Sequence, residues 1–140
     1  MKANSINLAS FLALQFHAGQ TYGIHNYSYH LTAVVDSVNR ENSTDDRLTI
    51  IAWLHDILED TLCKEDTLRN LFDNDIVDAV VALTRNSDES KSDYITRVKK
   101  NELARFVKKH DTMCNLTESF YRGDNRRIKK YTAQLSELIS

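Results

Sequence analysis

The sequence predicts an all-α protein built as a single helical bundle, and two observations support that prediction. Helix-breaking residues are scarce, because the 140 residues include no proline and only three glycines. Tight turns between strands rely on such residues, so a β-sandwich or barrel is disfavoured. Apolar residues also recur every three or four positions through most of the chain, as on the buried face of a helix. With no internal repeat and no linker, residues 1–140 are expected to form one domain.

The first expected elements are two helices separated by a loop. One helix is expected over residues 6–17, with Gly19 as its C-terminal stop, and the other over residues 27–40. The segment GQTYGIHN between them is expected to be a loop. A polar break, ENSTDD, follows the second helix, and Ser43 or Thr44 can cap the next one.

A third helix is expected over residues 45–60, and its two faces differ. Placed at 100° steps, most of its apolar residues share one arc, namely Ile50, Ile51, Trp53, Leu54, Ile57 and Leu58. The opposite arc carries one imidazole and three carboxylates, from His55, Asp56, Glu59 and Asp60. Such groups suit a divalent cation and the proton of a bound water molecule. A polar stripe opposite an apolar stripe is equally typical of any surface helix.

Five further helices are expected, over residues 64–72, 75–83, 90–100, 102–120 and 125–139. Lys108, Asp111 and Asn115 share one face of the helix over residues 102–120. Arg127 and Tyr131 share a face of the last helix. Basic neighbours extend this face into a patch that could hold a phosphate group: Arg126, Lys129 and Lys130. An Asp–Lys ion pair and a solvated basic face are the structural alternatives.

Composition argues against several classes of partner. The formal net charge is −2, so nucleic acid is not expected as the main partner. No stretch approaches the roughly 20 apolar residues of a membrane span, and no signal peptide is expected at the N-terminus. The two cysteines, Cys63 and Cys114, form no CxxC motif, which is typical of a reduced, cytoplasmic protein. The sequence does not define the oligomeric state.

The order of these segments resembles the hydrolase domain of RelA/SpoT proteins and their small single-domain relatives. The segments concerned are, in order, FHAGQ, YSYH, AWLHDILEDT, LTR, KKHDTMCNL and RIKKY. They extend from Phe16 to Tyr131, nearly the whole chain, and LHDILEDT is highly specific. The resemblance implies an HD-domain fold and a metal-dependent enzyme that removes the 3′-pyrophosphate of guanosine tetra- and pentaphosphate.

The resemblance also implies roles for individual residues. The metal ligands would be His30, His55, Asp56 and Asp111, with Mn²⁺ as the ion. Glu59 and Asp60 match the acidic pair that governs the attacking water. The substrate contacts would be Lys108, Asn115, Arg127 and Tyr131. Taken without the resemblance, His30 is typical of a histidine on the surface or at the edge of a core.

Two departures from the family pattern concern the substrate. Family members usually carry a basic pair in the loop before the first ligand, where this chain has Tyr22 and Gly23. Thr112 also stands where the family has a basic residue. Loss of a charge-assisted contact costs about 1.5–3 kcal/mol, and Tyr22 could compensate in part by stacking on a base. We therefore expect weak affinity for guanosine tetraphosphate (ppGpp) and a relaxed preference for guanine.

Three functions stay open at this point. The first is hydrolysis of a ppGpp-like nucleotide, and the second is hydrolysis of another nucleotide or phosphorylated metabolite. The third is a non-catalytic domain that binds a nucleotide. The presence of both Glu59 and Asp60 argues against the third, because binding alone does not need them.

Overall fold

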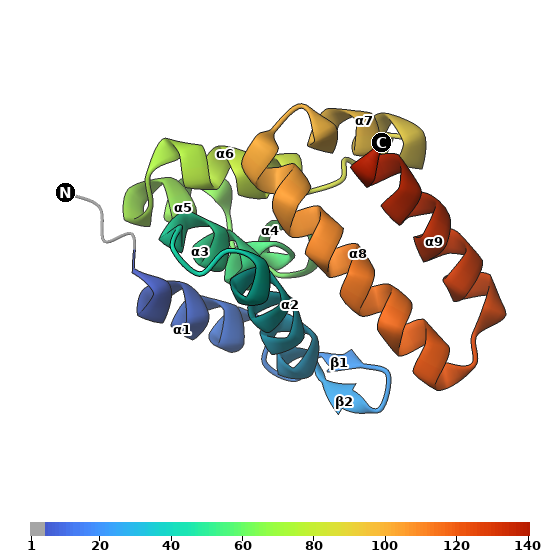
Figure 1. The fold of residues 1–140 in the computed structure, drawn as a ribbon. Coiled ribbons are helices and arrows are strands. Elements are labelled where there is room, and N and C mark those ends of the chain that lie inside the picture. The colour runs from blue at the N-terminus through green and yellow to red at the C-terminus, as the bar shows by residue number, and fades with distance from the viewer. Residues whose placement is uncertain (1–4) are drawn as a thin grey trace.

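The computed structural model describes residues 5–140 and confirms the all-α prediction (Figure 1). Its elements are, in order, α1 (Ile6–Phe16), β1 (Thr21–Tyr22), β2 (His25–Asn26), α2 (Tyr27–Glu41), α3 (Asp46–Leu54), α4 (Ile57–Asp60), α5 (Glu65–Leu71), α6 (Asn74–Ala82), α7 (Lys91–Lys99), α8 (Glu102–Arg122) and α9 (Asn125–Ile139). Apart from the third expected helix, every helix begins and ends at most two residues from its expected bounds.

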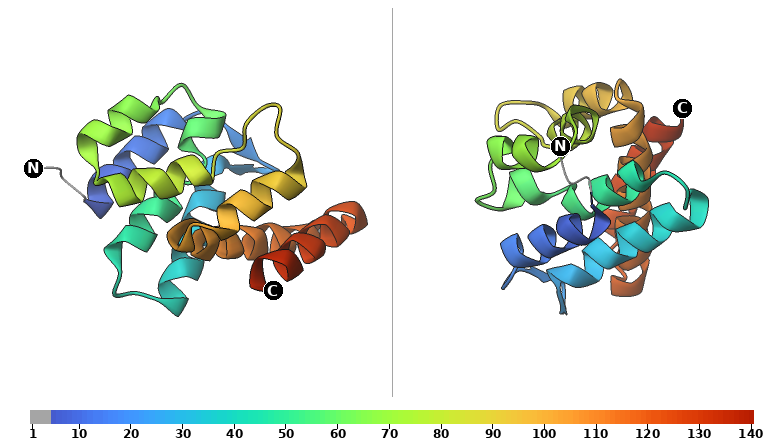
Figure 2. Two further views of the ribbon diagram at one scale, coloured as in Figure 1. Left: turned by 90° about the horizontal axis from the view of Figure 1, so that it is seen from above. Right: turned by 90° about the vertical axis from the view of Figure 1, so that its left-hand side faces the viewer.

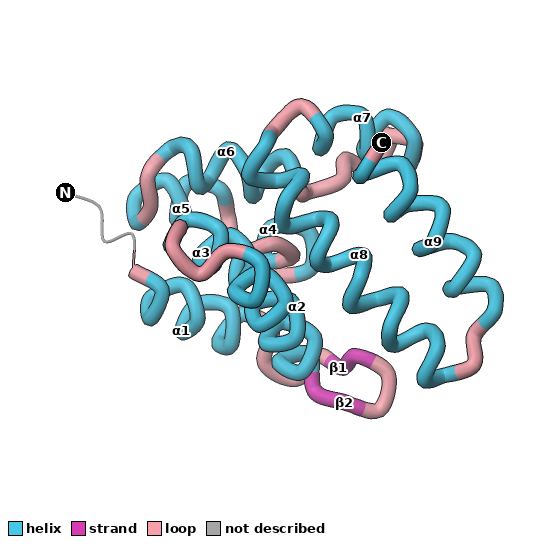
Figure 3. Tube along the Cα trace, in the orientation of Figure 1, coloured by secondary structure: helices cyan, strands magenta, loops and turns pink. Residues whose placement is uncertain are grey.

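The segment expected to be a loop forms a short β-hairpin instead (Figure 3). Its strands β1 and β2 are antiparallel, with Thr21 opposite Asn26 and Tyr22 opposite His25. The turn begins at Gly23, whose φ of +61° suits a two-residue hairpin turn. Because β2 leads directly into α2, the hairpin lies at the N-terminal end of that helix.

The single helix expected over residues 45–60 is two helices, so that prediction is wrong. α3 ends at Leu54 and α4 begins at Ile57. At the break, Asp56 has φ −109° and ψ 1°, which is outside the helical range. Neighbouring side chains on a continuous helix point about 100° apart. The break instead lets His55 and Asp56 approach each other, with 3.0 Å between imidazole Nε2 and carboxylate Oδ2.

The N-terminus of α3 has a different cap from the expected one. The side chain of Asp45 accepts a hydrogen bond from the backbone amide of Arg47. Asp45 also accepts from the Arg47 guanidinium, at 2.9 Å. The charged carboxylate of Asp45 binds the amide and the guanidinium of Arg47 more strongly than a neutral hydroxyl would. The prediction of Ser43 or Thr44 as the cap is therefore wrong.

α3 is the central helix of the bundle. It packs against α1, α2, α6 and α8 (Figure 2). Ile51, Ala52 and Leu54 are fully buried. His55 is only 2% exposed. α3 is therefore a core helix rather than a surface helix, whereas Glu59 and Asp60 of the expected polar stripe are exposed on α4.

Because Ile51 is fully enclosed, its truncation is expected to lower stability strongly. Ile51→Ala removes buried methylene groups and leaves a cavity, which typically costs about 2–5 kcal/mol of unfolding free energy. Phe11→Ala is the matched control, because Phe11 is 59% exposed on α1. Urea unfolding followed by circular dichroism measures both. Equal losses for the two variants would contradict the placement of α3 in the core.

α8 and α9 lie side by side on one flank of the molecule (Figures 1 and 2). Gly123 ends α8 in a left-handed conformation, and Asp124 caps α9. Leu138 is the one buried residue of α9, so this helix is attached through a single face. Among residues 5–140, no helix combines the length and the apolar character needed to cross a membrane.

Candidate metal centre

Three predicted ligands meet where α2 approaches the break between α3 and α4. One donor atom each from His30, His55 and Asp56 lies within 4.8 Å of the other two. His30 is on α2 and is 3% exposed, while His55 follows the last residue of α3. A group of two imidazoles and one carboxylate at this separation could hold a metal ion.

Asp111 of α8 adds a second carboxylate to this group. Its Oδ1 lies 2.9 Å from His30 Nε2 and 3.5 Å from His55 Nε2. Lys108 donates to its other oxygen at 3.0 Å, and Asn115 donates to Oδ1 at 3.2 Å. The structure thus places Asp111 against both histidines, although the two are 81 and 56 residues away in the sequence.

The donors suit a cation, and the strongest indication comes from His55. Its Nδ1 lies 2.7 Å from the carbonyl oxygen of Ala52, which can only accept a hydrogen bond. Nδ1 must therefore carry the proton, and a neutral ring presents a lone pair at Nε2. That atom is buried and makes no hydrogen bond of good geometry within residues 5–140. A lone pair facing the carboxylates of Asp56 and Asp111 is unfavourable, so Nε2 either takes up a proton or shares a cation with them.

The pKa values show the same excess of negative charge. Burial alone would lower the pKa of His55, but the carboxylates of Asp56 and Asp111 outweigh it and raise that pKa well above its usual range. Burial raises the pKa of Asp111, whereas Lys108 and His55 lower it, and the net shift is strongly downward. These carboxylates therefore remain charged, and the cluster takes up either a proton or a cation.

The acidic pair lies next to the cluster on α4. Oxygens of Glu59 and Asp60 lie within 4.8 Å of each other and of Asp56. Burial, followed by the charges of Asp56 and Glu59, raises the pKa of Asp60 to about 6. Glu59 accepts a hydrogen bond from the backbone amide of Arg85 at 2.6 Å. The two acids are thus held by different surroundings despite being neighbours.

The predicted basic contacts lie on α9 and α8. Arg127 donates to Ser119 at 3.2 Å, and its guanidinium lies 5.4 Å from the Tyr131 ring centroid. Lys130 lies 4.9 Å from the same ring. Burial and the neighbouring cations, Arg127 first, lower the pKa of Lys130. Among the described residues, neither Arg127 nor Lys130 has a carboxylate partner, so positive charge is left uncompensated here.

Sequence reasoning missed the role of Tyr27, which follows the hairpin. Its hydroxyl donates a short hydrogen bond to Asp56, and its ring is stacked on His17 at 4.6 Å. His17 lies 2.7 Å from the side chain of Gln20, whose amide donates to the Asp60 carbonyl at 2.8 Å. The segment FHAGQ of the sequence pointed to these contacts, because it contains His17 and Gln20.

His110, next to the predicted ligand Asp111, faces away from the cluster. Its Nδ1 lies 2.6 Å from the Ser37 hydroxyl, and its Nε2 lies 2.7 Å from Glu41. Both partners are on α2, so His110 joins α8 to α2 rather than facing the cluster.

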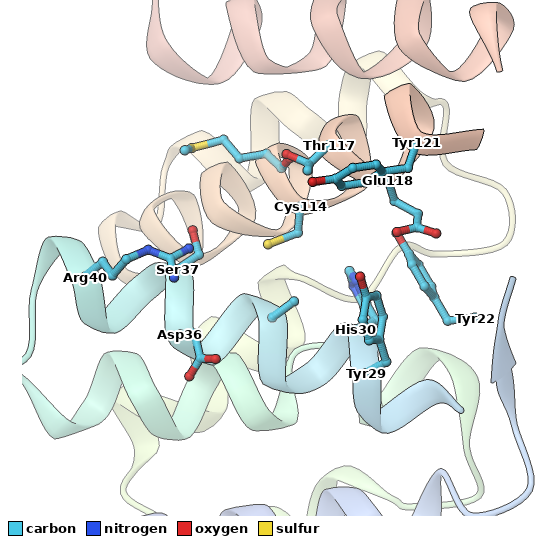
Figure 4. Close-up of a pocket in the computed structure, with 12 residues that line it drawn as sticks. Tyr22, Tyr29, His30, Asp36, Ser37, Arg40, Cys114, Thr117, Glu118 and Tyr121 are labelled. Carbon is cyan, nitrogen blue, oxygen red and sulfur yellow. The ribbon is translucent and has the colours of Figure 1, made fainter. Parts of the chain in front are cut away.

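A cavity of about 340 Å³ lies beside His30, between α2 and α8 (Figure 4). Tyr22, Tyr29 and Tyr121 contribute to its walls. Tyr22 reaches from the hairpin toward α8 at the edge of this cavity, next to His30 (Figure 4). The cavity therefore adjoins the cluster on the side of α2.

Comparison with known proteins supports the fold. No family model matches the sequence, and no curated protein matches it. Among solved structures, the chain is similar to a protein described as a metazoan ortholog of SpoT that hydrolyzes ppGpp and plays a role in starvation responses. The two share 21% sequence identity with a TM-score of 0.81, over 99% of this chain and 85% of that one. The all-α fold implied by the sequence resemblance is thereby confirmed.

Proposed function

We propose that this protein is a metal-dependent phosphohydrolase whose substrate is a nucleotide of the ppGpp type, cleaved at its 3′-pyrophosphate. The observation that carries the proposal is the buried His55 Nε2, which lies 3.0 Å from Asp56 Oδ2 and 3.5 Å from Asp111 Oδ1 but makes no hydrogen bond of good geometry within residues 5–140. A fold similar to that of a ppGpp-hydrolysing protein supports the choice of substrate class. The acidic pair Glu59 and Asp60 lies beside the cluster and supplies the carboxylates that hydrolysis would need.

In this proposal the four predicted ligands, His30, His55, Asp56 and Asp111, hold a divalent cation, with Mn²⁺ as the proposed ion. Such an ion, when bound, lowers the pKa of water and neutralises charge on a phosphoryl group. Tyr27 orients the Asp56 carboxylate through its hydrogen bond. Lys108 does the same for Asp111, so two of the ligands are held by donors of the chain itself.

Glu59 and Asp60 are the proposed proton acceptors. Each carboxylate lies within 4.8 Å of an Asp56 oxygen, which is close enough to orient a water molecule shared with the ligand set. Glu59 is fixed by the Arg85 amide, and Asp60 by its place in α4. Their task is to position the attacking water and to take up its proton.

The uncompensated cations on α9 favour an anionic substrate. Arg127 and Lys130 flank Tyr131 without a carboxylate partner among the described residues. Bound phosphate would relieve their mutual repulsion. Asn115 and Lys108 already bond to Asp111, and we propose that they contact the substrate on that side.

The test is hydrolysis of ppGpp with and without Mn²⁺. We expect pyrophosphate release only in the presence of the ion, with weak apparent affinity and comparable cleavage of the adenine analogue, measured by chromatography of the nucleotide products. Protein treated with a chelator is the control. Cleavage of another phosphorylated metabolite but of neither nucleotide would favour the alternative substrate class. The replacement of the family's basic pair by Tyr22 and Gly23 supports that alternative. No turnover across a broad panel would favour nucleotide binding without catalysis.

A further inference from the structure

Tyr22 is joined to the candidate metal centre by a chain of two hydrogen bonds. Its hydroxyl donates to Asn115 Oδ1 at 2.5 Å, and the amide nitrogen of Asn115 donates to Asp111 Oδ1 at 3.2 Å. That oxygen also lies 2.9 Å from His30 Nε2. A residue of the hairpin therefore reaches a predicted ligand on α8 through a single intermediate side chain.

The ring of Tyr22 also touches a second predicted ligand directly. It is stacked on the His30 imidazole, with 4.5 Å between centroids and 16° between ring planes. Stacked aromatic pairs restrict the tilt of both rings. One side chain of β1 thus acts on His30 of α2 and on Asp111 of α8 at the same time.

Tyr22 is itself held in place from α8. The guanidinium of Arg122 lies 5.1 Å from its ring centroid, and Arg122 is tied to Glu118 at 3.4 Å. This approach depends on Gly23, because a Cβ atom built there would lie 2.5 Å from Arg122 Nη2. The glycine next to Tyr22 therefore lets a cation of α8 hold the tyrosine from a second direction.

We propose that Tyr22 is a positioning residue of the metal centre, which orients Asn115, and through it Asp111, while its ring fixes His30. This inference rests on the proposed function only in assuming that these residues hold an ion. The direction of the Asn115 amide is the physical core of the inference. An asparagine can present either its oxygen or its nitrogen, and only the nitrogen can donate to Asp111. The Asp111 carboxylate accepts only and therefore takes the nitrogen, and the Tyr22 hydroxyl, by donating to Oδ1, holds the amide in that orientation.

This role differs from the base stacking expected for Tyr22 from the sequence. The ring already contacts His30 and the Arg122 guanidinium. A base could stack on it only after one of these groups has moved. Positioning uses the hydroxyl, whereas stacking uses the ring, and a single substitution separates the two.

Tyr22→Phe removes the hydroxyl and keeps the ring. We expect the affinity for Mn²⁺ to fall by about tenfold or more, measured by calorimetric titration of the metal-free protein. Loss of a residue that hydrogen-bonds a metal ligand typically lowers metal affinity by about 10–100-fold. Tyr29→Phe is the matched control, since the Tyr29 hydroxyl makes no hydrogen bond within the described chain. Asn115→Ala should show a loss similar to that of Tyr22→Phe. The double variant should lose no more than Asn115→Ala alone, because Tyr22 acts through Asn115.

Asp56→Ala is titrated in parallel to separate the two proposals. If Asp56→Ala abolishes Mn²⁺ binding while Tyr22→Phe binds like the unmodified protein, the positioning role is overturned and the metal centre stands. If Asp56→Ala binds Mn²⁺ fully, Asp56 leaves the ligand set and the proposed four-ligand metal centre fails. Additive losses for Tyr22→Phe and Asn115→Ala would also overturn the inference. Thermal unfolding of the metal-free variants, expected to be little changed for Tyr22→Phe, distinguishes a loss of positioning from a loss of fold.

Discussion

Replacement of Asp56 by alanine is expected to abolish Mn²⁺ binding and to reduce phosphohydrolase turnover to the level of the metal-free protein. Asp56 is the carboxylate shared by both groups of donor atoms, with His30 and His55 on one side and the acidic pair on the other. Its side chain makes no capping hydrogen bond to α4. Its removal therefore takes a ligand from the site without taking a cap from the helix, and the fold is expected to persist.

The measurement is elemental analysis of the purified variant together with ppGpp turnover. Asp36→Ala is the matched control, because Asp36 is an exposed carboxylate on α2 outside the cluster. Circular dichroism of both variants checks that the helices are retained. Full metal occupancy in Asp56→Ala would remove Asp56 from the ligand set.

Glu59→Gln is expected to lower kcat by about 10²–10⁴-fold while Mn²⁺ binding stays unchanged, the usual contribution of a general base. The amide oxygen of glutamine can still accept the hydrogen bond from the Arg85 backbone, so the local structure is retained. The amide cannot, however, take up a proton from water. The substitution thereby separates the proton-accepting role of Glu59 from its structural role.

Asp60→Asn is the informative comparison for this prediction. Burial and the charges of Asp56 and Glu59 raise the pKa of Asp60 to about 6, so this acid can also exchange a proton near neutral pH. Single-turnover rates of the two variants at saturating Mn²⁺ assign the role. Normal turnover in Glu59→Gln with a large loss in Asp60→Asn would move the proton acceptor to Asp60.

Most helices could be predicted from the sequence because their ends are marked locally. The helix from 125 to 139 follows the cap Asp124, and α8 ends at Gly123, the residue that takes the left-handed conformation. The break after Leu54 could not be predicted, because the apolar spacing continues through it. It is accompanied by a long-range hydrogen bond from Tyr27 to Asp56 and by a local one between His55 and the Ala52 carbonyl.

The candidate site could be predicted only in part for a similar reason. Helical spacing predicts His55 near Glu59, but the helix breaks between them and Glu59 instead groups with Asp56 and Asp60. No local pattern brings His30 to Asp111, 81 residues away. That pairing came from the resemblance of ordered segments to a known family. The contact of Tyr22 with Asn115 was missed, because it requires the hairpin, and the segment was expected to be a loop.

The single-sided attachment of α9 bears on how a product could leave. Arg127 and Tyr131 belong to this helix, which buries only Leu138. The predicted ligands instead come from the helices that enclose the core. Elements with few buried side chains can open locally at less than the global free energy of unfolding. Under the proposed function, local opening of α9 would free a phosphate group while the proposed donor atoms of the ion keep their places, so release and metal retention would depend on separate parts of the molecule.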